Sequence, residues 1–211
     1  MKIGVIQATS QKDMNEMLYH STVEAVKEYG YEIINFGCFK DEVDSFSYIE
    51  IALEICLLLE SNAVDFIITG CSSGQGMMLA CNSCPGILCG YVENPQDAYL
   101  FGRINDGNAI SFPLGLNFGW SGEINLRCTL EKLFEGPFGI GYPIEDAERK
   151  KQDTMLLKQM NALTKKRMVD IFDQIDEKLL IKALKRSNVV DYILENGDNE
   201  KLMNLIRKQL G

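Results

Sequence analysis

The stretch Phe66-Ile67-Ile68-Thr69-Gly70-Cys71-Ser72-Ser73-Gly74-Gln75-Gly76 decides the fold of this chain. It begins as a short apolar run, typical of a strand that is buried on both faces, and continues into a glycine-rich segment and a helical pattern. The amides of such a loop, together with the positive end of the next helix, form a cradle for an anion. The same amides favour the thiolate form of Cys71 over the thiol. The stretch therefore predicts a site that holds a negatively charged group and moves a proton.

Short β-rich segments alternate with amphipathic segments over the first two thirds of the chain. Strands are expected at residues 3–6, 31–36, 64–69, 86–91 and 109–112, and helices at residues 13–29, 48–59, 77–81, 94–103 and 123–134. Alternation of strand and helix is typical of a parallel sheet with right-handed crossovers. We therefore predict an α/β fold, a three-layer α/β/α sandwich with a five-stranded parallel Rossmann-like sheet.

The last third of the chain has a different character. From about Ala147 no further strand is expected, and charged helical patterns dominate. The predicted organisation is an α/β domain at residues 1–146, followed by a helical C-terminal extension at residues 147–211.

Composition narrows the class of protein. The formal net charge of −9 over 211 residues argues against a nucleic-acid or anionic-membrane partner. No segment reaches the roughly 18 to 20 apolar residues of a membrane helix, and the apolar run at the N-terminus is too short for a signal peptide. The seven cysteines are odd in number and scattered through apolar segments, which indicates free thiols in a reducing compartment. We predict a cytoplasmic protein.

Several other interpretations of the central loop are open to test. Its glycines could serve only a tight turn between strand and helix. The spacing Gly70-x-x-x-Gly74-x-Gly76 is not the dinucleotide fingerprint, and no phosphate-loop lysine follows Gly76. The pair Cys81-x-x-Cys84 lacks a second pair of ligands at a suitable spacing, so neither a metal nor a cofactor is expected.

The loop and the residues after it resemble the core signature of the ribose-5-phosphate isomerase B and galactose-6-phosphate isomerase family. That signature is Cys-Gly-Thr-Gly-x-Gly-Met followed by Ala-Asn-Lys-x-Pro-Gly-Ile-Arg, and the corresponding stretch here is Cys71–Ile87. Asn105-Asp106-Gly107-Asn108 resembles the family's His-Asn-Asp-x-Asn segment. The resemblance covers roughly residues 1 to 135. It implies cofactor-independent aldose–ketose isomerisation of a phosphorylated pentose or hexose through an enediolate.

The resemblance also implies roles for individual residues. Cys71 stands at the position of the catalytic base, and Ser73 replaces a threonine whose hydroxyl assists near the substrate. A thiolate at a helix N-terminus can abstract a proton while loop amides hold the developing oxyanion. The predicted substrate-binding residues are Ser72, Gly74, Gln75, Gly76, Asn105, Thr9, Ser10 and Arg103.

Some family positions carry different residues in this chain. The Asp-His pair that usually ends the first strand is replaced by Ala8 and Thr9, and the histidine thought to help open the sugar ring is Ile104. Ser45 stands where the family has a substrate-contacting tyrosine. The only histidine, His20, is expected to be an ordinary residue of the first helix. Either the substrate opens without help, or it differs from ribose 5-phosphate.

The remaining expectations concern phosphate binding and partners. The basic candidates for phosphate binding are Arg103, Arg127 and Arg149, because arginine suits bidentate phosphate contact. The resemblance implies a homodimer or dimer of dimers with shared active sites. Two other hypotheses are a non-catalytic sugar-phosphate-binding protein and a flavodoxin-like nucleotide-binding module.

Overall fold

A single parallel sheet forms the centre of the molecule. The structure, a computed structural model, describes residues 1–211. Its five strands lie in the order β2-β1-β3-β5-β4. They are β1 (Lys2–Ile6), β2 (Glu32–Gly37), β3 (Phe66–Cys71), β4 (Cys89–Tyr91) and β5 (Ala109–Pro113). The predicted α/β fold with a five-stranded parallel sheet is confirmed.

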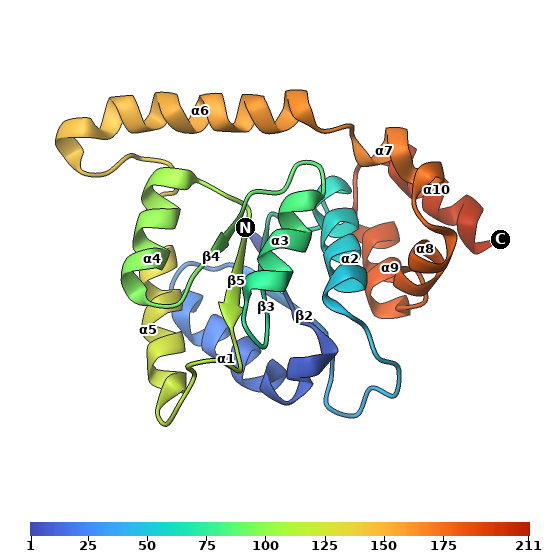
Figure 1. Cartoon of the computed structure of the whole chain (residues 1–211), viewed down its shortest axis with the longest axis horizontal. Helices are drawn as coiled ribbons and strands as arrows, with labels where there is room; N and C mark the ends of the chain where they lie inside the picture. Colours follow the sequence, from blue (N-terminus) through green and yellow to red (C-terminus); the bar gives the residue numbers. More distant parts are fainter.

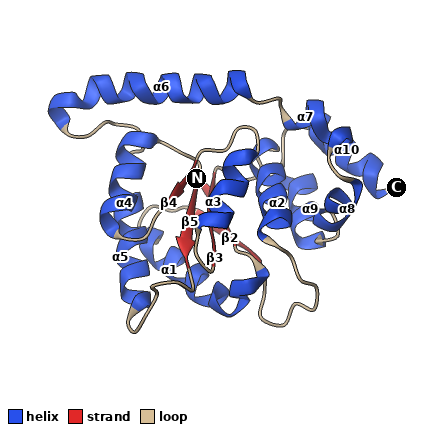
Figure 2. Cartoon of the chain, in the orientation of Figure 1, coloured by secondary structure: helices blue, strands red, loops and turns tan.

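Helices cover both faces of the sheet (Figures 1 and 2). One face carries α1 (Asn15–Val26), α4 (Pro95–Leu100) and α5 (Gly122–Phe134), and the other carries α2 (Tyr48–Glu60) and α3 (Gln75–Ser83). Every residue of β3 is buried. Successive side chains point to opposite faces, so Phe66 and Ile68 enter one core while Ile67 enters the other. This two-sided burial explains the uninterrupted apolar run in the sequence.

The segment after α4 differs from the helix expected at residues 94–103. The α-helix begins as expected, with the Asn94 side chain accepting a hydrogen bond from the Asp97 amide. After Leu100 the backbone widens into a π-helix at Phe101–Asn105, which ends at Asp106 with a left-handed backbone. The spacing of apolar residues in the sequence does not distinguish an α-helical turn from a π-helical turn. This segment brings the Arg103 side chain under α5, where it donates to the Leu133 carbonyl.

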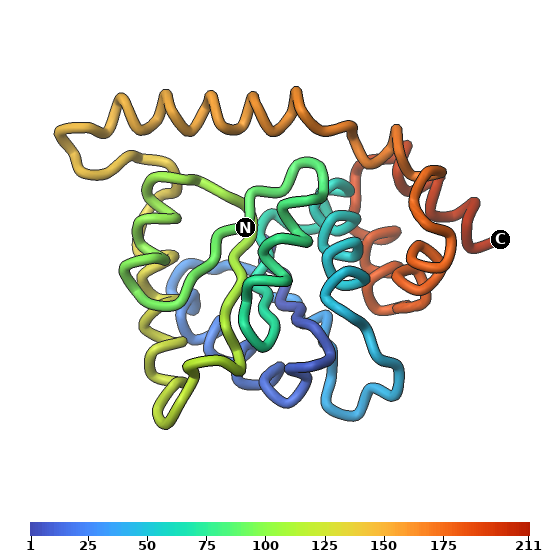
Figure 3. Tube along the Cα trace, in the orientation of Figure 1, coloured from blue at the N-terminus to red at the C-terminus, as the bar shows by residue number.

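A helical region follows the sheet, as predicted. It comprises α6 (Ala147–Thr164), α7 (Met168–Ile171), α8 (Glu177–Ala183), α9 (Ser187–Asn196) and α10 (Glu200–Leu210). Figure 3 shows α6 crossing above the α/β part, with the last helices gathered beside α2. Those last helices share one continuous apolar core with α2, whereas only Thr154 of α6 is buried. No helix of the structure combines the length and apolar character that a membrane crossing requires.

A buried ion pair fastens the last helices to α2. Arg186, in the connection from α8 to α9, donates through Nη1 to Glu54 Oε2 at 2.6 Å and through Nε to Glu42 Oε1 at 3.0 Å. Glu54 has no solvent exposure. Burial raises the pKa of Glu54 from 4.5 to about 7, although Arg186 acts in the opposite direction.

This pKa predicts a dependence of stability on pH. Between 4.5 and about 7 the folded protein keeps a Glu54 proton that the unfolded chain has released, so the free energy of unfolding falls as the pH rises through this range. Relative to a Glu54→Gln variant, the wild type is expected to lose about 2 kcal/mol between about pH 5.5 and about pH 8. Urea unfolding across that range measures the difference. An exposed-site control, Glu131→Gln, should follow the wild type, and parallel curves for Glu54→Gln and wild type would contradict the assignment.

Candidate active site

The order of the strands changes direction between β1 and β3. From β1 the chain moves outward to β2, and from β3 it moves to the other side, where β5 and β4 lie. In open α/β sheets, ligands bind outside the carboxyl ends of the strands at such a switch point. Here the Ala8 amide, just after β1, donates to the Gly70 carbonyl of β3 at 3.2 Å. Cys71, the last residue of β3, therefore lies at the position where a ligand is expected.

The backbone around Cys71 is held by the segment that follows β5. The Leu114 amide donates to the Cys71 carbonyl at 3.0 Å, and the Gly115 and Leu116 amides donate to the Ser72 carbonyl at 3.0 and 2.7 Å. Cys71 itself is 8% exposed and belongs to the apolar core at the carboxyl end of β3. This support fixes where the strand ends and where residues 71–76 begin, a segment that we call the catalytic loop for the role that the family resemblance implies.

Gly74 gives the catalytic loop its shape. Its φ is +73°, and it is the residue just before α3. The Gly74 carbonyl accepts a hydrogen bond of 2.7 Å from the buried Ser111 hydroxyl. Because α3 begins immediately after this turn, the free amides of its first turn lie beside the loop. They can stabilise negative charge that develops on a bound molecule.

Polar side chains from the end of β1 meet the catalytic loop. Gln11, in the short 3-10 helix Thr9–Met14, donates through Nε2 to the Ser72 hydroxyl at 2.9 Å. Ser10, Ser72 and Gln75 are exposed, and Ser73 is half-buried. The structure thus brings the predicted residues of these two segments to one edge of the sheet.

Tyr48 is a site residue that the sequence-based list lacks. A methyl group built on Gly76 would lie 3.6 Å from its ring, so the ring covers the first turn of α3. Tyr48 is the first residue of α2, directly after Ser47 and inside the Ser47–Glu50 capping box. Because α2 follows β2 in a parallel sheet, its N-terminus lies at the carboxyl edge. The capping box, read together with this topology, could have placed Tyr48 at the site.

Thr9 also has a structural role. Its hydroxyl accepts from the Phe46 amide at 2.8 Å and donates to Cys38 Sγ at 3.3 Å, and its amide donates to the Phe46 carbonyl. The hydroxyl is engaged with the segment that joins β2 to α2. Thr9 therefore holds that segment beside the end of β1, and the substrate contact predicted for Thr9 stays a prediction.

Arg103 and Asn105 do not lie with Cys71 in the same chain. Both come just before β5 begins and thus belong to the opposite edge of the sheet. Arg103 is 1% exposed, between the rings of Tyr99 and Phe138, and burial lowers its pKa. The core encloses this guanidinium in the single chain, and the substrate contact predicted for Arg103 stays a prediction. Asn105 lines a separate cavity of about 460 Å³ along β4.

The other arginines proposed for phosphate binding are also remote from the catalytic loop. Arg127 pairs with Glu131 along α5, and Arg149 pairs with Asp146 and Asp153 at the start of α6. These are exposed pairs of a helix surface. Within one chain, the residues around Cys71 therefore offer hydroxyl, amide and phenol groups, and none of the predicted arginines lies with them.

Comparison with known proteins agrees with this geometry. The model of the Ribose/Galactose Isomerase family matches residues 3–120. The chain belongs to this family. It is accordingly a sugar isomerase, an intramolecular oxidoreductase, and the predicted family resemblance is confirmed. No curated protein matches the chain.

Two solved structures match the chain over its whole length. One is a 4-deoxy-L-threo-5-hexosulose-uronate ketol-isomerase complexed with a tartrate, with 36% identity and a TM-score of 0.95 over 100% of this chain and 99% of that one. The other is a ribose-5-phosphate isomerase from Vibrio parahaemolyticus, with 35% identity and a TM-score of 0.93 over 99% of both chains. Their coverage includes the C-terminal helices.

More distant structures share the fold over a smaller part of the chain. The type B ribose 5-phosphate isomerase from Trypanosoma cruzi has 18% identity and a TM-score of 0.63, and it covers 77% of this chain while 99% of its own length is matched. The rest of this chain has no counterpart there. The isomerase and its two full-length matches thus form a longer version of the fold.

Proposed function

We propose that this isomerase converts an open-chain aldose into the corresponding ketose through an enediolate, with Cys71 as the base. The proposed substrate is an acidic sugar of the kind named for one of the full-length matches, 4-deoxy-L-threo-5-hexosulose uronate. The observation that carries the choice of substrate is the position of the only histidine. His20 lies exposed on α1 and pairs with Glu16 at 3.2 Å, away from the catalytic loop.

The chemistry of the named compound explains why no such histidine is required. An ordinary aldose closes its ring when the hydroxyl on carbon 4 or carbon 5 adds to the aldehyde. A 4-deoxy-5-hexosulose has neither hydroxyl, because carbon 4 is deoxygenated and carbon 5 is a ketone. Its aldehyde therefore cannot close either of these rings. Ile104, at the family's ring-opening position, suits a substrate that presents a free aldehyde.

The isomerisation needs one base and one oxyanion cradle. The Cys71 thiolate takes the proton from the carbon next to the aldehyde, and the electron pair moves onto the aldehyde oxygen, which gives the enediolate. Amides of the catalytic loop and the first turn of α3 stabilise that oxygen. The proton on the neighbouring oxygen passes to the former aldehyde oxygen, which moves the negative charge of the enediolate onto that neighbouring oxygen. As this oxygen becomes the ketone, the Cys71 thiol returns its proton to the former aldehyde carbon and is a thiolate again. Ser73 and the hydrogen-bonded Gln11–Ser72 pair are the side chains that we assign to the substrate hydroxyls.

The acidic group of the substrate needs a cation, and none of the predicted arginines lies beside Cys71 in the same chain. We assign it to a neighbouring subunit of a homodimer. Trp120 and Val43, both 98% exposed, lie in segments that follow carboxyl ends of strands. A second set of large exposed side chains lies on α6, which contacts Ile104 and Asp106 at the opposite edge of the sheet: Met155, Leu156, Leu157, Met160 and Leu163. Sedimentation of the purified protein should give a dimer or a multiple of it, and a monomer at micromolar concentration would contradict this assignment.

Steady-state kinetics with two substrates tests the proposed function. The isomerase is expected to turn over 4-deoxy-L-threo-5-hexosulose uronate with a kcat/KM on the order of 100-fold above that for ribose 5-phosphate. The second full-length match favours ribose 5-phosphate as the alternative, and a higher kcat/KM for that sugar would reverse the assignment. Binding of either sugar without turnover would favour a non-catalytic sugar-binding protein.

A further inference from the structure

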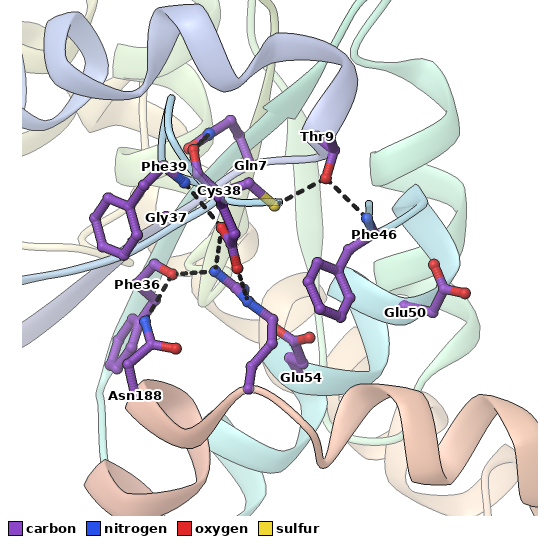
Figure 4. A network of polar contacts seen from close by, with 12 residues as sticks. Gln7, Thr9, Phe36, Gly37, Cys38, Phe39, Phe46, Glu50, Glu54 and Asn188 are labelled. Carbon is purple, nitrogen blue, oxygen red and sulfur yellow. Dashed lines mark hydrogen bonds and ion pairs between the residues drawn. The ribbon is translucent and has the colours of Figure 1, made fainter. Parts of the chain in front are cut away.

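One side chain of the C-terminal helices reaches beneath the wall of the active site. Arg186 is 4% exposed and lies between α8 and α9. It belongs to the network of polar contacts in Figure 4, where its partners Phe36, Phe46 and Glu54 are labelled. Besides its bonds to Glu54 and Glu42, Nη2 donates to the Phe36 carbonyl. The guanidinium also lies over the Phe46 ring, 5.0 Å from its centre.

These partners span the whole segment that joins β2 to α2, residues 38–47, which we call the wall loop. Phe36 lies just before the wall loop, Glu42 lies in its middle, and Phe46 lies near its end. The Glu42 carboxylate also accepts from the Phe39 amide at 2.9 Å. A single guanidinium thus joins the start, middle and end of the wall loop to the buried Glu54 on the next helix.

The wall loop also contacts the 3-10 helix Thr9–Met14, whose Gln11 reaches the catalytic loop. Phe46 is bonded in both directions to Thr9, and the Lys12 amino group donates to the Glu42 carbonyl at 3.4 Å. Two residues after Phe46, Tyr48 places its ring against Gly76 of the catalytic loop. Arg186 is thus joined to Phe46 by contact, Phe46 to Tyr48 along the chain, and Tyr48 to the first turn of α3 by contact with Gly76.

The backbone of the wall loop is adapted to this guanidinium. Gly37 has a φ of +89°, and a methyl group built there would lie 2.8 Å from Arg186 Nη2. The space that a side chain at position 37 would fill is thus occupied by Arg186. Apolar side chains of similar volume often stabilise a protein as well as a buried ion pair does. The ion pair therefore contributes position and direction, which the planar guanidinium provides through several fixed donors.

We propose that Arg186 is a positioning residue of the isomerase, through which the C-terminal helices hold the wall loop and Tyr48 in place for substrate binding. This inference rests on the active site proposed at Cys71. The base and the oxyanion cradle belong to a different loop. Loss of Arg186 is therefore expected to weaken substrate binding more than it slows proton transfer. The shorter isomerases of the same fold lack a counterpart for about a quarter of this chain.

The test compares three variants of the full chain. Arg186→Met removes the guanidinium, and Arg186→Met with Glu54→Gln also removes the buried carboxylate that would otherwise be left unpaired. Lys201→Met is the control, because Lys201 forms an exposed pair with Asp170 in the same helical region. Both Arg186 variants are expected to raise KM by about 10- to 100-fold, with kcat changed much less. Lys201→Met should match the wild type.

Hydrogen exchange provides a readout that does not depend on turnover. In the Arg186 variants the amides of Phe46 and Ser47 should exchange at least about tenfold faster than in the wild type, while the amides of β3 keep their protection. Faster exchange in the wall loop without a change in KM would reduce Arg186 to a structural residue. Unchanged exchange and unchanged KM in the double variant would overturn the proposal. If the wild type turns over neither sugar, the proposed substrates are wrong. The exchange experiment then still tests whether Arg186 stabilises the wall loop.

Discussion

Replacement of Cys71 by alanine is expected to lower kcat for the isomerisation by about 10²- to 10⁴-fold, the range that a positioned general base contributes. The loss should appear in kcat, because the amides of the catalytic loop and the residues of the wall loop still bind the sugar. The fold should survive, since Leu114 holds the backbone at this position through the Cys71 carbonyl. The measurement is a steady-state assay beside thermal unfolding of the same samples.

Cys81→Ala is the matched control for this substitution. Cys81 is fully buried on α3, one of the elements that form the site, and its pKa is raised by the neighbouring Cys89 thiol and by burial. It is therefore a thiol in the same region without access to a substrate. The Cys81→Ala variant should keep its kcat. A Cys71→Ala variant that retains more than about a tenth of the wild-type kcat would remove Cys71 from the role of base.

The second large effect is expected at Gly74. Alanine at this position would have to adopt a φ of +73°, and its methyl group would lie 2.8 Å from the Tyr91 ring and 2.9 Å from backbone atoms of Phe112 and Pro113. Because β5 is a central strand, its backbone cannot move aside easily. The expected loss is about 3 kcal/mol or more in the free energy of unfolding, together with isomerase activity.

Gly30→Ala separates the two causes of this loss. Gly30 has a similar φ of +65°, but a methyl group there would meet nothing within 4 Å. It should cost only about 1 kcal/mol, the contribution of the backbone conformation alone. Urea unfolding of both variants measures the two values. Equal losses at the two glycines would contradict the close packing of the catalytic loop against β5.

The sheet could be predicted from the sequence because each strand has a local sequence pattern that indicates a strand. The apolar run at Phe66–Thr69 and the alternation of strand and helix indicate buried parallel strands, and the structure has them. No sequence pattern predicts that β5 lies between β3 and β4, because the strand order depends on how strands distant in the chain pair. The catalytic loop could be placed for the same reason as the strands: its residues are adjacent in the chain.

The parts of the site that escaped prediction depend on contacts between distant residues. Arg103 resembles an exposed helix arginine in sequence, but the π-helix and the rings of Tyr99 and Phe138 enclose it. Arg186 and Glu54 are separated by 132 residues, and no periodicity connects them. Pairs of this kind arise only from tertiary packing, which composition and spacing do not encode.

Solvent deuterium provides the most direct test of the central claim, that Cys71 moves the proton of the sugar. The isomerase is incubated with 4-deoxy-L-threo-5-hexosulose uronate in deuterium oxide, and the label is located by nuclear magnetic resonance. In the ketose product we expect deuterium on the carbon that was the aldehyde carbon of the substrate. With the Cys71→Ala variant we expect neither product nor label. Label that enters the sugar at the wild-type rate with Cys71→Ala would contradict the account.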